Sequence, residues 1–291
     1  MYIKFIKMKK YLIINSLWFC FLSESFGQIA FPNQETLQLF LKSKTYIVLE
    51  DAMFSQFNEA IRDAAQKHWK ITSYEVINLA KFETISKNPQ ASFLMVVIGE
   101  YTGIGKNTKY NMLTLIMGHK SGDINKMPEI LSIPLAYYID ENSNADEESY
   151  DYKLGGILEG MQYAVKNILN QKLNLSNLKN SLNAFSKEVK TMELWLTKND
   201  LSGNANTIEK IQTVYPYKVV ITSSEAIQQA IDDKKSDVAF VHKIGNGAVK
   251  NGICIKTVIS CADGKILYGD FHNVSSKEPD GFLLKDFENL K

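Results

Sequence analysis

Two residues near the C-terminal end of the chain are the first candidates for a chemical site. Asp270 and His272 stand two positions apart in the run KILYGDFHNV, so both would project from the same face of a β-strand. A carboxylate beside an imidazole could form half of a metal site or of an acid–base pair. An exposed polar strand face is the simpler interpretation, and we expect it here.

His242 is the third candidate. It lies near the end of the apolar run DVAFVHKIG, where polar residues begin to alternate with apolar ones. None of the four histidines is paired at metal-ligand spacing on a helix, and Cys-x-x-Cys and Gly-x-Ser-x-Gly motifs are absent from the sequence. We therefore predict no catalytic residue, no metal ligand and no cofactor, and keep His242, Asp270 and His272 as the positions to inspect.

Residues 99–108, GEYTGIGKNT, share a Gly-Lys pair with phosphate-binding loops. Such a loop needs a glycine where Glu100 stands and a serine or threonine where Asn107 stands, and it must lead into a helix. Here an apolar, strand-like run follows. We interpret the segment as the loop of a β-hairpin.

Residues 140–151, DENSNADEESYD, place oxygen ligands at several positions of a calcium-binding loop. The sharp turn of such a loop requires glycine where Ala145 stands, and the last ligand is Asp151 in place of the longer glutamate. A solvated acidic loop is the preferred interpretation, with adventitious calcium binding as the alternative.

Cys254 and Cys261 lie in one apolar run, GICIKTVISC. Seven positions is an odd spacing, so the two thiols would face opposite sides of a strand, ~23 Å apart at ~3.3 Å per residue. This distance excludes a disulfide between them. We predict two unpaired thiols, at least one of them buried.

The N-terminal segment has the layout of a secretory signal peptide. Four lysines precede the 12-residue apolar run YLIINSLWFCFL, and the small and polar residues SESFGQ follow it. Twelve residues are too few to span a bilayer, which needs ~20. We predict that residues 1–28 are removed and that the mature protein is periplasmic or secreted; an uncleaved anchor is the alternative.

The predicted mature chain gives little sign of nucleic-acid or membrane binding. Cleavage after Gln28 removes four lysines and one glutamate, which turns the formal net charge of +1 slightly negative. A nearly neutral chain lacks the basic surface that nucleic acid requires. Since no later run is apolar over 18 residues, we also expect no membrane span in the mature chain.

One phrase of the sequence occurs twice. Residues 69–99 and 217–245 both begin with an aromatic residue and a lysine, continue through β-branched, Ser/Thr and helix-like stretches, and end in an apolar run closed by Ile-Gly. We predict an α/β fold of two similar lobes, each a mixed sheet of βαβαββ(β) order with helices packed on it. The first lobe would cover 29–172, with an N-terminal helix and a linker helix, and the second 173–291. The alternative is that two unrelated α/β units merely share this alternation.

The apolar run of each copy makes a separate prediction. Residues 93–98 contain no polar side chain, so both faces of that strand should be buried, as in a central strand. In the second copy His242 and Lys243 interrupt the run, so we expect that strand end to be more exposed. Pro134 restricts its own strand to an edge or a bulge.

Short motifs in both copies resemble a known envelope-protein domain. SDVAFVHKIG and SCADGKIL are similar to phrases of the N-terminal α/β domain of TolB and of the core of CsgG-type outer-membrane lipoproteins. The first copy departs from the pattern, with Ala91 where these families have aspartate, and the β-propeller of TolB has no counterpart. The resemblance implies an envelope protein that works through protein contacts without catalysis.

Two functions follow from these observations. The first is an exported, non-catalytic envelope protein that acts through contacts with a protein partner. The alternative is a small-ligand-binding protein with its site between the lobes, where pockets tend to form. An enzyme is the third and least supported possibility. A closed apolar contact between the lobes favours the first, and a deep cleft lined by Tyr and Trp favours the second.

Overall fold

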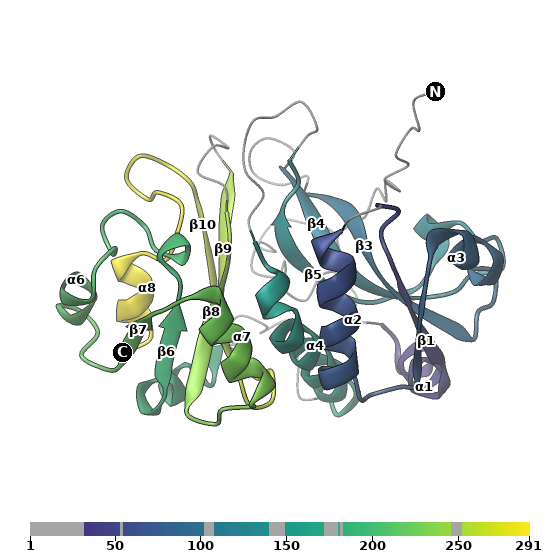
Figure 1. The fold of residues 1–291 in the computed structure, drawn as a ribbon, viewed down its shortest axis with the longest axis horizontal. Helices are drawn as coiled ribbons and strands as arrows, with labels where there is room; N and C mark the ends of the chain where they lie inside the picture. The colour runs from purple at the N-terminus through teal and green to yellow at the C-terminus, as the bar shows by residue number, and fades with distance from the viewer. Residues whose placement is uncertain are drawn as a thin grey trace.

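The computed structural model describes residues 32–52, 55–101, 108–139, 149–171, 180, 183–245 and 252–291 (Figure 1). They form two five-stranded mixed sheets, each with helices packed on it. The predicted α/β class with two similar lobes is confirmed.

The first lobe follows the N-terminal helix α1 (Gln34–Lys42). Its sheet has the strand order β2-β1-β3-β4-β5. Its elements are, in chain order, β1 (Lys44–Val48), α2 (Gln56–His68), β2 (Tyr74–Ile77), α3 (Leu79–Ile85), β3 (Ala91–Tyr101), β4 (Thr108–Met117), the 3₁₀ turn η2 (Ile124–Lys126), β5 (Glu129–Tyr137), the 3₁₀ turn η3 (Asp151–Lys153) and α4 (Leu154–Leu169).

The second lobe has the strand order β7-β6-β8-β9-β10. Its elements are the 3₁₀ turn η5 (Ser186–Thr191), β6 (Glu193–Leu196), the 3₁₀ turn η6 (Lys198–Asp200), α6 (Ile208–Gln212), β7 (Val219–Ile221), α7 (Ser224–Asp232), β8 (Val238–Ile244), β9 (Ile253–Ser260), β10 (Ile266–Asn273) and α8 (Leu284–Asn289).

The two lobes repeat one topology. In each, the first strand pairs in parallel with the second and third, and the third, fourth and fifth pair antiparallel. Tyr46 lies opposite Phe93 in the first sheet, and Trp195 lies opposite Phe240 in the second. α2 contacts α4, and α6 contacts α8. The helix expected to be a linker, α4, is therefore the last helix of the first repeat, so the repeating unit is βαβαβββα.

Side-chain caps fix where several of these helices begin. Ser55, Thr207 and Ser223 each accept a hydrogen bond from the backbone N–H three residues later. Such a cap satisfies one of the N–H groups that the first helical turn leaves without a partner. α2 and α7 thus start directly after short polar residues.

Two strand predictions are confirmed. β3 is the middle strand of its sheet, and Phe93 and Leu94 are fully buried on its two faces. β5 is an edge strand, and its register with β4 shifts beside Pro134. Proline has no N–H to donate to a neighbouring strand, so it is tolerated at an edge or a bulge, and here it has both.

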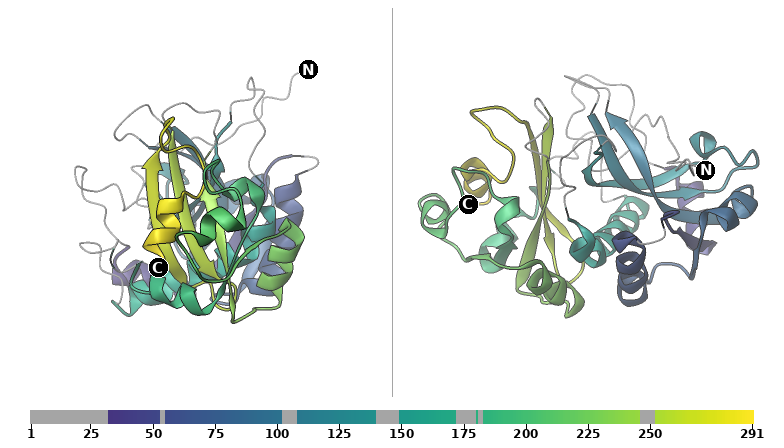
Figure 2. Two further views of the ribbon diagram at one scale, coloured as in Figure 1. Left: turned by 90° about the vertical axis from the view of Figure 1, so that its left-hand side faces the viewer. Right: turned by 45° about the horizontal axis from the view of Figure 1, so that its top comes forward.

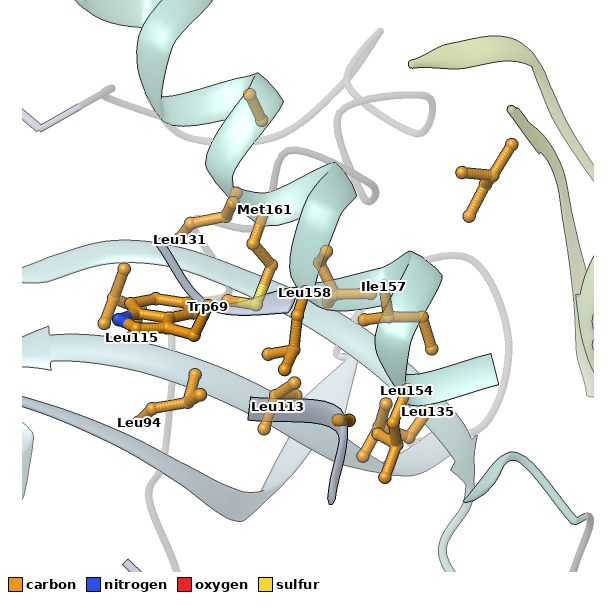
Figure 3. Packing of buried hydrophobic residues seen from close by; sticks show 14 of the residues in the cluster. Trp69, Leu94, Leu113, Leu115, Leu131, Leu135, Leu154, Ile157, Leu158 and Met161 are labelled. Atoms are coloured by element: carbon orange, nitrogen blue, oxygen red, sulfur yellow. The ribbon is translucent and has the colours of Figure 1, made fainter. Parts of the chain in front are cut away.

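α4 lies at the centre of the molecule and joins the cores of the two lobes. Leu158 and Met161 pack with Trp69 and strand residues of the first sheet (Figure 3). The same apolar cluster includes Phe240 and Ile259 of the second sheet. In the right-hand view of Figure 2 the two sheets lie nearest to each other at one end of the molecule and spread apart towards the other end, where α2, α4 and α7 lie between them. The lobes thus share this hydrophobic cluster.

Among the residues that the structure describes, no helix combines the length and apolar character required to cross a membrane.

Candidate functional site

The three candidate residues do not come together. In the second sheet Lys243, Lys256 and Asp270 are paired across β8, β9 and β10, and so share one face. His272 alternates with Phe271 and shares the face of Asp270, as predicted from their spacing. His242 precedes Lys243 and therefore lies on the opposite face, which is turned towards the first lobe.

The expectation that His242 stands at an exposed strand end is wrong. Its side chain is only 1% exposed, and its Nε2–H donates to the carbonyl oxygen of Pro134 at 3.0 Å. Burial, followed by the nearby charge of Lys153, lowers the pKa of His242 to about 3, so the ring is neutral at physiological pH. His242 therefore serves as a hydrogen-bond donor that closes the edge of β5 against the second sheet.

Lys243, the other polar residue of that strand end, is also buried. Its Nζ donates to the carbonyl oxygen of Gly245 at 2.8 Å and to Asp280 Oδ2 at 3.0 Å. The sequence shows that this strand loses its apolar pattern, but it does not show that the C-terminal segment supplies an acceptor for the ammonium group. A paired lysine can be buried where an unpaired one would be exposed.

The expected exposed polar face at Asp270 and His272 is not found. His272 is buried, and its Nε2–H donates to the carbonyl oxygen of Pro279 at 2.9 Å. Burial lowers the pKa of His272, with a further contribution from Lys256. Asp270, which is half-buried, has a carboxylate oxygen 3.3 Å from the hydroxyl of Tyr268, whose nearer acceptor is Asp286 at 3.1 Å. Both side chains are thus engaged by their own strand or by the C-terminal segment.

A buried ion pair on the same face was missed in the sequence analysis. Lys256 Nζ lies 2.6 and 2.7 Å from the two carboxylate oxygens of Asp286, and both side chains are 1% exposed. Asp286 also accepts from the backbone N–H of Leu283 and from the hydroxyl of Tyr268. The pair fixes α8 to the sheet. The only trace of it in the sequence is a lone lysine within the apolar run ICIKTVIS.

Both cysteines are buried and unpaired, as predicted. The Cys254 thiol lies 3.9 Å from the carbonyl oxygen of Gly281 on the face of α8, and Cys261 belongs to the core between the lobes. Burial raises the pKa of both thiols, that of Cys261 to about 12. At neutral pH neither forms the thiolate that a nucleophile requires.

Two other sequence candidates are described only at their flanks. The phosphate-loop-like segment joins β3 to its antiparallel partner β4, which agrees with a hairpin, while residues 102–107 lie outside the described residues. Residues 140–148 of the acidic segment also lie outside them. Within the described part of the chain, no three His, Cys, Asp or Glu side chains are grouped so as to hold a metal ion.

The seam between the lobes brings together polar and aromatic groups from both repeats. The hydroxyl of Tyr137 donates to the carbonyl oxygen of Ile253 at 2.7 Å, and the ring of Tyr110 packs beside it, with centroids 4.9 Å apart. These rings share an apolar cluster with Ile244 and Ile255 of the second sheet. Apolar side chains therefore fill this part of the seam.

A buried ion pair closes the seam nearer to α4. Lys153 Nζ lies 3.0 Å from Asp200 Oδ1, with the two side chains 3% and 4% exposed. Burial alone would lower the pKa of Lys153, but the charge of Asp200, the neighbouring Tyr152 and the hydrogen bonds to both together raise the pKa. The second oxygen of Asp200 accepts from the N–H and the hydroxyl of Thr197. Both charged groups are thus satisfied within the chain.

The fold and the seam define an α/β protein of two similar lobes in which the described polar groups of the seam bind one another. Comparisons with protein-family models, with curated proteins and with solved structures give no match to this chain.

Proposed function

We propose that the protein is an exported, non-catalytic component of the cell envelope whose two lobes act as one scaffold for a protein partner. The basic and apolar N-terminal segment supports export. The resemblance of SDVAFVHKIG and SCADGKIL to envelope-protein domains supports action through protein contacts.

The closed seam carries this proposal. His242, Tyr137 and Lys153 each direct a polar group to an acceptor in the other lobe. A ligand between these groups would have to displace hydrogen bonds and apolar packing that already satisfy both lobes. A rigid pair of lobes is well suited to present a fixed outer surface to a partner.

A small ligand between the lobes is the alternative function, and the tyrosines of the seam are what favours it. Tyr110 and Tyr137 could line a pocket if the lobes separated. Their hydroxyls would then have to leave the carbonyl oxygen of Ile253, to which Tyr137 donates at 2.7 Å. The alternative thus requires an open state of the seam.

Mild cross-linking in intact cells, followed by native mass spectrometry of the tagged protein from the envelope fraction, separates the two functions. We expect the mature chain to be recovered with a second protein at fixed stoichiometry. A matched chain without residues 1–28, kept in the cytoplasm, should lack that partner and controls for association after lysis. A retained non-protein mass would favour the ligand, and a lone chain with no added mass would contradict both.

A further inference from the structure

His68 lies where three helices of the two repeats meet. It ends α2, its ring is 1% exposed, and its Nε2 lies 2.9 Å from Asp232 Oδ1 at the end of α7. Its Nδ1 faces Glu159 Oε1 of α4 at 3.4 Å. Gly155 of α4 allows this approach, because a Cβ there would stand 2.7 Å from the ring. One imidazole therefore touches both repeats.

Both ring nitrogens face a carboxylate oxygen, and this arrangement selects one protonation state. A neutral imidazole has a single N–H and can donate to only one of the two carboxylates. The imidazolium donates from both nitrogens, so only the protonated ring satisfies Asp232 and Glu159 together.

The surrounding charges favour the same state. Ion pairs extend from the two carboxylates that face His68: Lys67, which also binds Asp63, binds Asp232, and Lys234 binds Glu159. Within this ion-paired cluster the three carboxylates outnumber the two lysines by one, while the adjacent Asp233 accepts from Gln229. A protonated His68 balances the cluster. The 3₁₀ turn η3 also packs here. Its Lys153 is bound to Asp200, and the pKa of its Asp151 is raised by burial and by the charge of Glu50.

We propose that His68 is a pH-sensitive clasp that holds α7 of the second lobe against α2 and α4 of the first while it is protonated. Loss of the proton leaves one carboxylate without its imidazole donor and gives the cluster a net negative charge. The lobe contact then weakens at this end of the seam, where Lys67 and Lys234 are the remaining ionic links and are about half exposed.

The pH window follows from the directions of the pKa shifts. Burial alone would lower the pKa of His68, but the hydrogen bonds to Glu159 and Asp232 together raise it above its usual value of ~6.5. Stabilisation by a raised pKa is complete below ~6.5 and is lost as the pH rises through the pKa of the folded protein. Burial opposes ionisation of Glu159 and Asp232 as well, but their hydrogen bonds lower both pKa values, so the clasp persists into mild acid.

A histidine titration by NMR tests the first step. The Cε1–H signals of the four histidines can be assigned with single His→Gln variants. We expect the His68 midpoint to lie above ~6.5 and to fall towards this value in the Asp232→Asn and Glu159→Gln variants. A midpoint at or below ~6.5 in the unaltered protein would overturn the proposal.

Amide hydrogen exchange tests the consequence for the lobes. After correction for intrinsic exchange rates, amide exchange in α7 should accelerate as the pH rises through the His68 midpoint. The equilibrium constant for opening should rise ~10-fold for each unit by which the pKa of His68 in the folded protein exceeds its usual value. His68→Gln should abolish this dependence, and His119→Gln, at an exposed site whose ring binds Ser121, should keep it. If His68→Gln does not fold, Asp232→Asn replaces it. If His68→Gln or Asp232→Asn showed the same pH dependence of exchange as the unaltered protein, the clasp would be refuted.

Discussion

The buried pair Lys153–Asp200 gives the sharpest test of how the lobes are joined. At 3.0 Å and an effective dielectric constant of ~20, the two charges attract by ~5 kcal/mol. Most of this attraction is offset by the desolvation of two ions that are 3% and 4% exposed. Removing one partner leaves the other buried without a counterion, which typically costs ~3–5 kcal/mol.

We therefore predict that Lys153→Met and Asp200→Asn each lower the free energy of unfolding by ~3–5 kcal/mol. The double variant should lose clearly less than the sum of the two, with a coupling energy above ~2 kcal/mol, because it leaves no unpaired buried charge. The exposed cross-strand pair Lys44–Glu75, 46% exposed on each side, is the matched control. Its coupling should stay below ~1 kcal/mol.

Urea unfolding followed by tryptophan fluorescence supplies these values. Trp69 is buried in the first lobe and Trp195 lies in the second, so variants that keep one of them report each lobe separately. Because the lobes share a hydrophobic cluster, both probes should give the same midpoint. Additive losses in the Lys153–Asp200 cycle, or two separate midpoints in the unaltered protein, would refute the view that the pair locks the lobes into one cooperative unit.

Three further outcomes are expected. Gly156→Ala should cost ~1–3 kcal/mol in urea unfolding, because its Cβ would stand 2.5 Å from the ring of Phe240, whereas Gly203→Ala, with open space around it, should cost ~1 kcal/mol or less. Alkylation of the native mature protein should leave Cys254 and Cys261 unmodified, and alkylation after unfolding should add two labels; a disulfide would contradict this. N-terminal sequencing of envelope material should find a chain that begins between residues 28 and 30, and a retained first methionine would indicate an anchor.

The sequence predicted the features that depend on local pattern. The unbroken apolar run of β3 predicted a central strand, and Pro134 predicted an edge or a bulge, because each follows from groups within one strand. The repeated phrase predicted two similar lobes. The helix α4 was expected, but as a linker, and α8 was not predicted, because α4 and α8 share no obvious sequence phrase that marks them as the last helix of each repeat.

Features that depend on distant partners were not predictable. His242 looked like the start of an exposed strand end, but its acceptor is Pro134, 108 positions earlier in the chain. Lys256 stands alone in an apolar run, and its partner Asp286 comes from α8. A polar residue in an apolar run signals either exposure or a buried partner, and one sequence alone does not distinguish the two.

The last strand of each repeat illustrates how the two copies have diverged. β5 and β10 both lie at the edge of their sheets, where unpaired backbone groups can template the addition of another chain. The β5 edge is covered by the second lobe, with His242 bound to the carbonyl oxygen of Pro134. If β10 of one molecule made the same kind of contact with a neighbouring molecule, the result would be a head-to-tail interface, which does not by itself close into a symmetric dimer. Asn183 instead occupies the β10 edge, where its amide accepts from the N–H of Gly269 at 3.0 Å and donates to the carbonyl oxygen of the same residue at 3.2 Å. The side chain thus satisfies the backbone groups of Gly269 as a neighbouring strand would.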